Sequence, residues 1–217
     1  MAPPDSAHPT PPSARQRLCR AVASIAGAEG LAAATPEGIA AEAGLPSEAF
    51  WAEFGTVEDC FLAMYDAAVA DLLANVTAAT GSCHQTGDAN WQELLDAGFA
   101  AMLAFFAADP LLARACVVEA AFFGQAAWTR RDRVLDLFIG YLEHVRQTQA
   151  GRVPRLAPEM IVRGVHEVVV AHVARGETEE LPGLLADLRY VWLVPFVGRY
   201  EASSAREADE HAHPGSG

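Results

Sequence analysis

The sequence predicts an all-α protein in which a small N-terminal domain of three helices, containing a helix-turn-helix, precedes a larger helical domain. Apolar residues recur at spacings of three and four along most of the chain, and no segment shows the clear alternation of a β-strand. The composition is 52% hydrophobic and rich in alanine, which suits packed helices. Residues that start and stop helices divide positions 13–60 into three short segments.

The composition excludes several classes of function. The 217 residues include no lysine, which rules out a phosphate-binding loop lysine and a Schiff-base lysine. The net charge of −13 argues against attraction of the whole molecule to nucleic acid or to an anionic membrane. Only a local basic patch would therefore bind DNA. The length allows one or two domains with a sizeable core.

The sequence also carries information about the compartment. No stretch reaches about 18 uninterrupted apolar residues, so we expect no membrane-spanning helix. The proline-rich N-terminus lacks the apolar core of a signal peptide. The four cysteines, at positions 19, 60, 83 and 116, show neither close pairing nor metal-type spacing. We therefore expect free thiols in a reducing cytoplasm and no metal site.

The chain is expected to divide into four parts. Residues 1–12 hold five prolines and are expected to be a disordered arm, and the polar residues 201–217 a disordered tail. Between them lie the small domain at 13–60 and the larger domain at 61–200.

The first helix is expected over residues 13–29, with an apolar inward stripe that includes Leu18 and Val22. Its arginines, Arg15, Arg17 and Arg20, lie away from that stripe and are candidates for contacts with DNA phosphates. The alternative is an ordinary solvated helix face.

The helix-turn-helix is expected between positions 35 and 54. Thr35 before Pro36 supplies a side-chain cap and a proline at a position where its missing N–H costs nothing. Gly44 tolerates a left-handed backbone and ends this helix. A second short helix then runs from Pro46 to Phe54, and it is the helix that would enter the DNA major groove.

Two runs of residues here carry a family resemblance: Ile39-Ala-Ala-Glu-Ala-Gly-Leu-Pro-Ser-Glu-Ala-Phe-Trp-Ala-Glu-Phe54 and Glu58-Asp-Cys-Phe-Leu62. They are similar to the DNA-binding domain of the TetR family. Residues 181–198 are similar to the last helix of actinobacterial-type members, so the resemblance extends over about 13–200. Trp51, Glu53 and Val57 stand where the family usually has tyrosine, histidine and lysine at positions that contact phosphate.

The resemblance implies a cytoplasmic homodimeric transcriptional regulator, a repressor, which binds double-stranded operator DNA and is released by a small apolar or aromatic effector. It implies no cofactor and no enzymatic activity. The DNA contacts that it implies, together with those from the first helix, are Arg15, Arg17, Arg20, Thr35, Pro46, Ser47, Glu48, Trp51 and Ala52.

A second interpretation stays open beside the regulator. Residues 13–60 carry three arginines against seven carboxylates, a net charge of −4, whereas DNA-binding domains are usually basic. The alternative is a ligand-binding protein or an enzyme on the same fold that has lost DNA binding. Enzyme motifs such as Gly-x-Ser-x-Gly and His-Glu-x-x-His are absent from the sequence.

The larger domain is expected to consist of six helices. Helical spacing and breaking residues place them at about 56–77, 90–107, 110–123, 126–149, 158–174 and 184–198. Residues 81–90 and 176–183 are expected to be a loop and a turn, and Gly124 to break the chain between two helices.

The middle helices are rich in aromatic and sulfur-containing side chains, which are typical of an apolar small-molecule pocket. Ordinary core packing is the alternative for each of them. The candidate ligand-binding residues are Trp91, Met102, Phe106, Cys116, Phe122, Phe123, Trp128, Phe138, Tyr141 and His166.

The last two helices each carry a broad apolar face. The resemblance implies that these faces form a four-helix interface between two subunits, and burial within one subunit is the alternative. The candidate dimer-interface residues are Ile161, Val165, Val169, His172, Leu188, Trp192 and Phe196. The six-residue spacing of His166 and His172 disfavours a shared metal ion.

Overall fold

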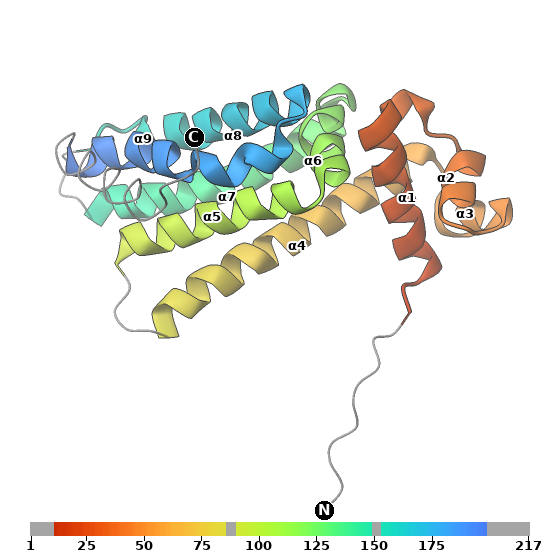
Figure 1. Ribbon diagram of the computed structural model, residues 1–217, viewed down its shortest axis with the longest axis horizontal. Helices are drawn as coiled ribbons and strands as arrows, with labels where there is room; N and C mark the ends of the chain where they lie inside the picture. The colour runs from red at the N-terminus through yellow and green to blue at the C-terminus, as the bar shows by residue number, and fades with distance from the viewer. Residues whose placement is uncertain (1–10, 86–89, 149–152, 199–217) are drawn as a thin grey trace, which may run out of the picture.

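The computed structural model describes residues 11–85, 90–148 and 153–198, and over these residues the chain forms nine α-helices, three 3-10 helices and no strand. The small domain contains α1 (Ala14–Glu29), α2 (Pro36–Glu42) and α3 (Ser47–Glu53). The larger domain contains α4 (Val57–Gln85), α5 (Trp91–Ala108), α6 (Pro110–Val117), α7 (Gln125–Thr148), α8 (Ala157–Arg175) and α9 (Leu185–Val197). The small domain sits at one end of the larger bundle, and α4 runs between them (Figure 1). The all-α prediction is confirmed. The tail at 201–217 and residues 1–10 of the arm lie outside the described residues.

Local capping explains why the first helices begin and end where they do. The Ser13 hydroxyl accepts a hydrogen bond from Gln16 N at 3.2 Å, and the Gln16 side chain accepts one from Ser13 N at 2.9 Å. The Thr35 hydroxyl accepts from Gly38 N at 3.0 Å and caps α2 as expected. Gly44 has φ of +63°, the left-handed conformation that allows the turn into α3.

The fourth helix is longer than the sequence indicated. It continues to Gln85, so the expected loop at 81–90 is wrong for residues 81–85, while 86–89 lie outside the described residues. The side chains of Thr77, Thr80 and Ser82 bond back to carbonyls of the preceding turn instead of interrupting the helix. α5 packs along the same stretch, since Gly98 brings it close to Val76 and Thr80. Tertiary packing therefore outweighs the loop-like composition.

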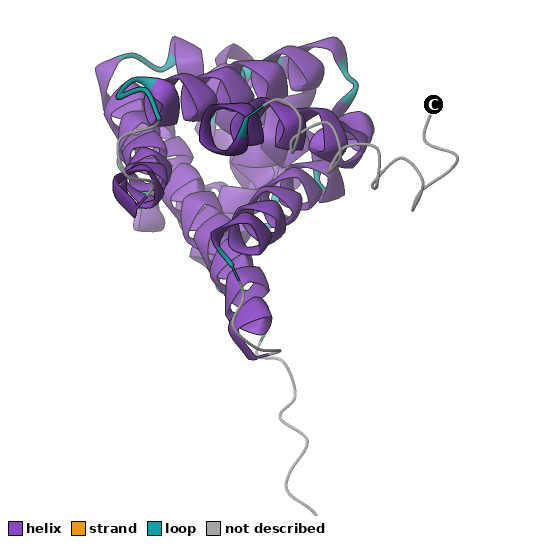
Figure 2. Cartoon of the chain, turned by 90° about the vertical axis from the view of Figure 1, so that its left-hand side faces the viewer, coloured by secondary structure: helices purple, strands orange, loops and turns teal. Residues whose placement is uncertain are grey.

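Two other segments differ from the expected pattern in detail. α6 ends at Val117, and the chain continues as a short 3-10 helix, Glu119–Phe122. The expected turn at 176–183 contains a second 3-10 helix, Thr178–Leu184; a third, Leu31–Ala33, precedes α2. Gly124 breaks the chain with φ of +73°, as expected. Figure 2 shows helix through most of the molecule, with loops confined to short connections.

The small domain has its own core, and part of the larger domain completes it. Leu18, Ile39 and Phe50 are fully buried between α1, α2 and α3. Small residues from α6 and α7, among them Ala115 and Ala127, belong to the same apolar cluster. The two domains are therefore joined through packed side chains as well as through the α4 backbone.

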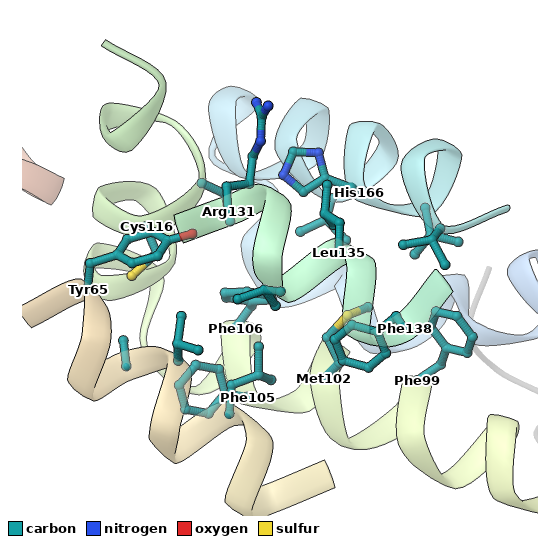
Figure 3. A pocket seen from close by; sticks show the side chains of 18 residues that line it. Tyr65, Phe99, Met102, Phe105, Phe106, Cys116, Arg131, Leu135, Phe138 and His166 are labelled. Carbon is teal, nitrogen blue, oxygen red and sulfur yellow. The ribbon is translucent and has the colours of Figure 1, made fainter. Parts of the chain in front are cut away.

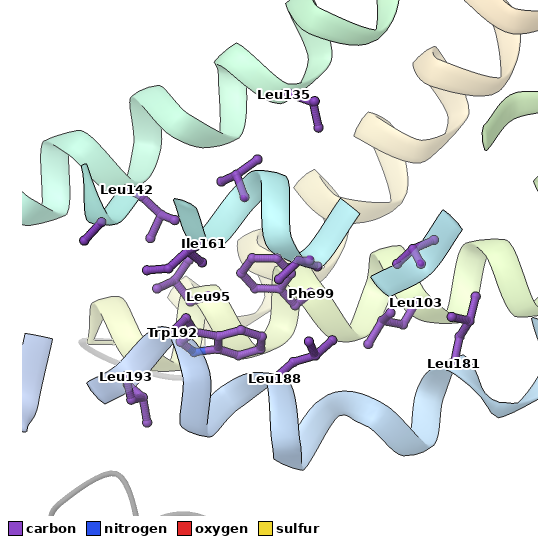
Figure 4. Packing of buried hydrophobic residues seen from close by; sticks show 14 of the residues in the cluster. Leu95, Phe99, Leu103, Leu135, Leu142, Ile161, Leu181, Leu188, Trp192 and Leu193 are labelled. Atoms are coloured by element: carbon purple, nitrogen blue, oxygen red, sulfur yellow. The ribbon is translucent and has the colours of Figure 1, made fainter. Parts of the chain in front are cut away.

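The larger core forms around Trp192, which is fully buried and stacks on Phe99 with ring centroids 4.2 Å apart (Figure 4). This corrects the expected dimer interface. Six of its seven residues are buried within the single chain, with 7% exposure at most: Ile161, Val165, Val169, Leu188, Trp192 and Phe196. For these six residues the structure agrees with the alternative given above, which was burial within one subunit. His172 is half-buried, and its Nδ1 lies 2.9 Å from the Val168 carbonyl oxygen.

One described helix is long and apolar enough to cross a membrane by length and composition: α4, over Val57–Cys83. The bent pair of α5 with α6 and the following 3-10 helix also passes that test as one broken span. α4 packs against both core clusters through residues such as Phe61 and Leu72. Its Asp66 pairs with Arg130 of α7 at 2.8 Å. We therefore describe α4 as the helix that joins the two domains.

Candidate ligand cavity and DNA-contact surface

The outer face of α3, the predicted recognition helix, is exposed. Ser47, Glu48 and Ala52 are exposed, and the Trp51 side chain is 56% exposed despite its size. Pro46, at the N-cap of α3, is exposed as well. α3 carries no basic residue, so any reading of bases by this surface would come from hydroxyl, carboxylate and aromatic groups.

Two of the three arginines assigned to phosphate are engaged inside the small domain. Arg17 donates to the carbonyl oxygens of Ala43 at 2.5 Å and Gly44 at 3.0 Å, and so fixes the turn between α2 and α3. Arg15 donates to the Glu53 carbonyl oxygen at 3.2 Å, and its guanidinium carbon lies 4.4 Å from the centre of the Phe54 ring. Arg20 is exposed on α1.

The larger domain contains an apolar cavity of about 80 Å³, partly open to solvent, between helices α4 to α8 (Figure 3). This volume is below that of most small-molecule sites, so a larger ligand would have to displace side chains of the wall. Five of the ten predicted ligand-binding residues lie on its wall: Met102, Phe106, Cys116, Phe138 and His166.

The other five predicted residues lie elsewhere. Trp91 packs on Phe196 with ring centroids 5.2 Å apart. Phe122 is 82% exposed on the 3-10 helix after α6. Tyr141 lines a neighbouring cavity between α4, α5 and α7. Helical periodicity could not separate these positions, because consecutive aromatic residues point to different neighbours once the helices are packed.

Phe123 and Trp128 lie near the boundary between the two domains. Phe123 stacks on Phe61 of α4, with ring centroids 4.7 Å apart, within the core of the small domain. The Trp128 indole N–H donates to the Ala121 carbonyl oxygen at 2.9 Å, and Trp128 lines a separate cavity beside the main one.

Sequence reasoning missed a large part of the cavity wall. Tyr65 and Val69 come from α4 and Arg131 comes from α7, and none of the three is among the predicted ligand-binding residues. Val165 and Val169, which were candidates for a dimer interface, also line the cavity. The helical spacing of Tyr65 and Val69 was the available signal for α4. The remaining missed wall residues are Ala68, Leu72, Phe99, Phe105, Val117, Val134, Leu135 and Val162.

The titratable groups on the wall are mostly uncharged at neutral pH. Burial raises the pKa of the Tyr65 hydroxyl and raises the pKa of the Cys116 thiol to about 12. Burial lowers the pKa of His166, whose Nδ1 lies 3.4 Å from Glu167 Oε1. Arg131 carries the formal charge on this wall, and its guanidinium lies 2.8 Å from Asp132 on the side away from the core. Among the described residues, no three His, Cys, Asp or Glu side chains could hold a metal ion.

α6 contacts both the cavity and the small domain. Its Cys116 lines the cavity, while Leu111 packs so closely on α1 that a Cβ at Gly27 would lie 2.7 Å from the Leu111 Cα. Just after α6, the Glu119 carboxylate accepts a hydrogen bond from Leu31 N at 3.1 Å. A shift of α6 at the cavity would therefore be transmitted to α1.

Several solved structures resemble this chain over most of its length. The fatty acid degradation regulator FadR from Bacillus halodurans matches with a TM-score of 0.72 and 18% identity, covering 87% of this chain and 97% of that one. A transcriptional regulator FadR from Bacillus subtilis, solved in complex with stearoyl-CoA, matches with a TM-score of 0.68 and 17% identity, covering 84% and 97%. A TetR-like transcriptional regulator from Rhodococcus sp. RHA1 matches with a TM-score of 0.58 and 21% identity, covering 85% and 97%.

No protein-family model and no curated protein matches the sequence. At these identities the structural likeness establishes the fold, a TetR-like helix-turn-helix domain followed by a helical domain, as the sequence predicted.

Proposed function

We propose that this protein is a cytoplasmic, ligand-responsive transcriptional regulator that binds operator DNA as a homodimer and is released by a small, mainly apolar effector. The observation that carries the proposal is the position of α6. Cys116 and Val117 of this helix line the cavity, and Leu111 of the same helix packs on α1 of the helix-turn-helix domain. A ligand would thus act on a helix that touches the DNA-binding domain directly.

The mechanism requires two conformations with different affinities for the ligand. In one, the two α3 helices of a dimer reach half-sites about 34–36 Å apart. In the other, a ligand pressing on α6 and on Tyr65 of α4 displaces α1 and changes that separation. The ligand favours the second conformation only if it binds that conformation more tightly.

The cavity supports an apolar effector, because hydrocarbon and aromatic side chains form nearly all of its wall. The Bacillus subtilis regulator with a similar fold was solved with stearoyl-CoA, which bears a long hydrocarbon chain. Aromatic compounds and acyl chains are both compatible with this lining.

A dimer interface requires exposed apolar side chains, and the last helices carry some in addition to the buried residues that the sequence predicted for the interface. Met160 on α8 is 69% exposed and Val191 on α9 is 54% exposed, and Leu156 precedes α8 with 64% exposure. Isolated exposed apolar residues are common, so these three side chains are the positions at which we propose to test for contact with a second copy.

A second candidate function is binding of an apolar ligand without DNA binding. The absence of any basic residue on α3 and the engagement of Arg15 and Arg17 within the small domain favour it.

Protection of DNA distinguishes the two candidates. The purified protein is incubated with the DNA upstream of its own gene at low salt, with and without an apolar ligand that raises its melting temperature. The regulator protects a site and releases it when the ligand is added. Ligand binding without protection at any salt concentration would favour the second candidate.

A further inference from the structure

Two of the four cysteines lie together where α1 packs against the beginning of α4 (Figure 1). Cys60 is in the first turn of α4 and is fully buried, and its sulfur lies 3.8 Å from the Leu18 carbonyl oxygen of α1. Cys19, the next residue of α1, packs against the same apolar cluster, and the two thiols are within hydrogen-bonding reach of each other. The fold thus pairs two thiols that are far apart in the sequence.

The surroundings of the two thiols leave one of them accessible. Ala23 of α1 and Ala63 of α4 border a solvent-accessible groove of about 600 Å³ between these helices and α6, and their small side chains allow the helices to approach closely. Cys19 is half-buried and lies on the wall of this groove. Cys60 lies one turn before Ala63 and is covered. A small solute in the groove can therefore reach Cys19 and not Cys60.

The two thiols also differ in acidity. The hydrogen bond with Cys60 lowers the pKa of Cys19 below its ordinary value, and the Arg15 guanidinium lowers it further. Partial burial and the Glu53 carboxylate act in the opposite direction and are outweighed. The contact with Cys19 and burial raise the pKa of Cys60. The thiol that faces the groove is therefore the one that ionises first, and the thiolate is the reactive form of cysteine.

The other two cysteines are in different settings. Cys83 lies near the far end of α4, roughly 35 Å from Cys60 along the helix axis, and its thiol donates to the Ala79 carbonyl oxygen at 3.5 Å. Cys116 lies on the wall of the main cavity, where burial raises its pKa to about 12. Cys116 is therefore a protonated thiol at neutral pH, and Cys83 is too distant to react with Cys60.

We propose that Cys19 and Cys60 form a site of reversible oxidation, at which a hydroperoxide generates a disulfide that fastens α1 to the beginning of α4. The Cys19 thiolate attacks one oxygen of hydrogen peroxide, and the O–O bond breaks. Cys19 becomes a sulfenic acid, and the departing hydroxide takes up a proton to form water. The Cys60 sulfur then displaces hydroxide from the Cys19 sulfur, and the Cys60 proton converts that hydroxide to a second water.

The two steps balance and are reversible. The two sulfurs together lose two electrons, which reduce the peroxide to two molecules of water. The second step is aided by the first, because a neutral sulfenic acid replaces the thiolate whose contact raises the pKa of Cys60. A dithiol reduces the disulfide by exchange and is itself oxidised. In a reducing compartment the disulfide is therefore transient, and the free thiols of this structure are the resting state.

The disulfide has a consequence for the contact between the domains. In the proposed regulator, a ligand displaces α1, which packs on α6 through Gly27 and Leu111. A covalent link from α1 to α4 opposes that displacement, so the oxidised protein should keep its DNA when the ligand is added. This consequence rests on the proposed function, whereas formation of the disulfide is independent of DNA and of any ligand.

The test uses the full-length protein, hydrogen peroxide and no DNA. The reduced protein is oxidised, its remaining thiols are alkylated, and the intact protein and a proteolytic digest are analysed by mass spectrometry. We expect two of the four thiols to be lost, the mass to fall by two hydrogens before alkylation, and the digest to contain a peptide that joins Cys19 to Cys60. Dithiothreitol should restore all four thiols.

Three variants assign the roles. Cys19→Ser should prevent the disulfide and slow the loss of thiols by about tenfold or more, because it removes the accessible thiolate. Cys60→Ala should leave a sulfenic acid on Cys19, which dimedone traps. Cys83→Ser is the matched control on the same helix as Cys60, and it should change the rate by no more than about twofold. Unchanged melting temperatures of the reduced variants show that each keeps its fold.

Two results with the wild-type protein would overturn the inference, whatever the stability of the variants. One is retention of all four thiols at peroxide concentrations that already oxidise the methionines of the chain. The other is a disulfide that joins Cys19 to a partner other than Cys60, including a second chain. Either result would leave the proposed regulator intact, because neither measurement involves DNA or an effector. Conversely, a protein that forms the Cys19–Cys60 disulfide and binds no DNA would support the oxidation site and contradict the regulator.

Discussion

The interiors of the two domains differ in how completely side chains fill them. In the small domain, Leu18, Ile39 and Phe50 are fully buried, and the Arg17 guanidinium is hydrogen-bonded to the turn that it supports. In the larger domain, aromatic rings enclose a cavity, and the Tyr65 hydroxyl has no partner among the described residues. From this comparison we expect the small domain to move as one body and the larger one to change shape around a ligand.

α6 belongs to both interiors, which makes the comparison testable. Its Ala115 lies in the core of the small domain, and the adjacent Cys116 lines the cavity. Substitutions in the filled core, at the contact between α6 and α1, and at the outer surfaces should therefore have effects of decreasing size.

The largest effect is expected from removing a ring from the filled core. Phe50→Ala should lower the free energy of unfolding by about 3–5 kcal/mol, because a fully buried ring leaves a cavity in rigid surroundings. Phe105→Ala, on a half-buried ring that already borders empty space, should cost less than half of that. Urea unfolding of the two variants measures both, and equal losses would contradict the distinction between the domains.

The next effect concerns the junction. Gly27→Ala places a methyl group against the Leu111 backbone, so α1 and α6 must separate, at a cost of about 1–3 kcal/mol. It should also weaken the response of DNA binding to ligand, since the contact between α6 and α1 carries that response in our proposal. Fluorescence anisotropy with labelled DNA and thermal unfolding give the two readings.

Gly140→Ala is the control for that substitution. Gly140 is exposed within α7, and a Cβ there meets no other atom within 4 Å. This change should stabilise the protein by up to about 1 kcal/mol through helix propensity alone. If both substitutions destabilise the protein, the close contact between Gly27 and Leu111 does not explain the effect at Gly27.

A smaller effect is expected at the surface proposed for the dimer. Met160→Asp should weaken self-association by at least about tenfold, because it places a charge in an apolar contact, while the helical content stays unchanged. Trp192→Asp, in contrast, should prevent folding, because Trp192 is buried within the chain. Light scattering combined with circular dichroism distinguishes them. A wild-type monomer at micromolar concentration would reject the dimer.

The smallest effect is expected on the DNA-contact surface. Val57→Lys would place an ammonium group at the start of α4, where the resembling family has lysine. It should steepen the dependence of log affinity on log salt by about 0.9 per subunit and leave sequence preference unchanged. Ser47→Ala, on the exposed face of α3, should alter the sequence preference and leave the salt dependence nearly unchanged. Titrations at several salt concentrations measure both, and an unaltered slope for Val57→Lys would indicate a different docking geometry.

The capping residues show what local sequence can predict. Ser13, Thr35 and Gly44 act through atoms within a few residues of themselves, so their roles follow without knowledge of the fold. The continuation of α4 through Gly81 does not follow, because α5 packs along that stretch only after the chain has folded.

The cavity shows what local sequence left open. Periodicity identified the apolar helices but could not choose between Trp128 at the edge and Tyr65 on the wall, since both are aromatic residues on helices. Five of the predicted ligand-binding residues line the cavity, and five lie elsewhere.

The order of the helices and the helix-turn-helix could be predicted from local sequence, because capping, glycine conformation and helical periodicity operate over single turns. Which neighbour each apolar face meets depends on the packing of the whole chain. A face such as that of Trp192 would satisfy the hydrophobic effect equally well against its own chain or a second copy, since burial of apolar area has no direction. Only the packed fold shows that Trp192 stacks on Phe99 and that Arg17 holds a turn.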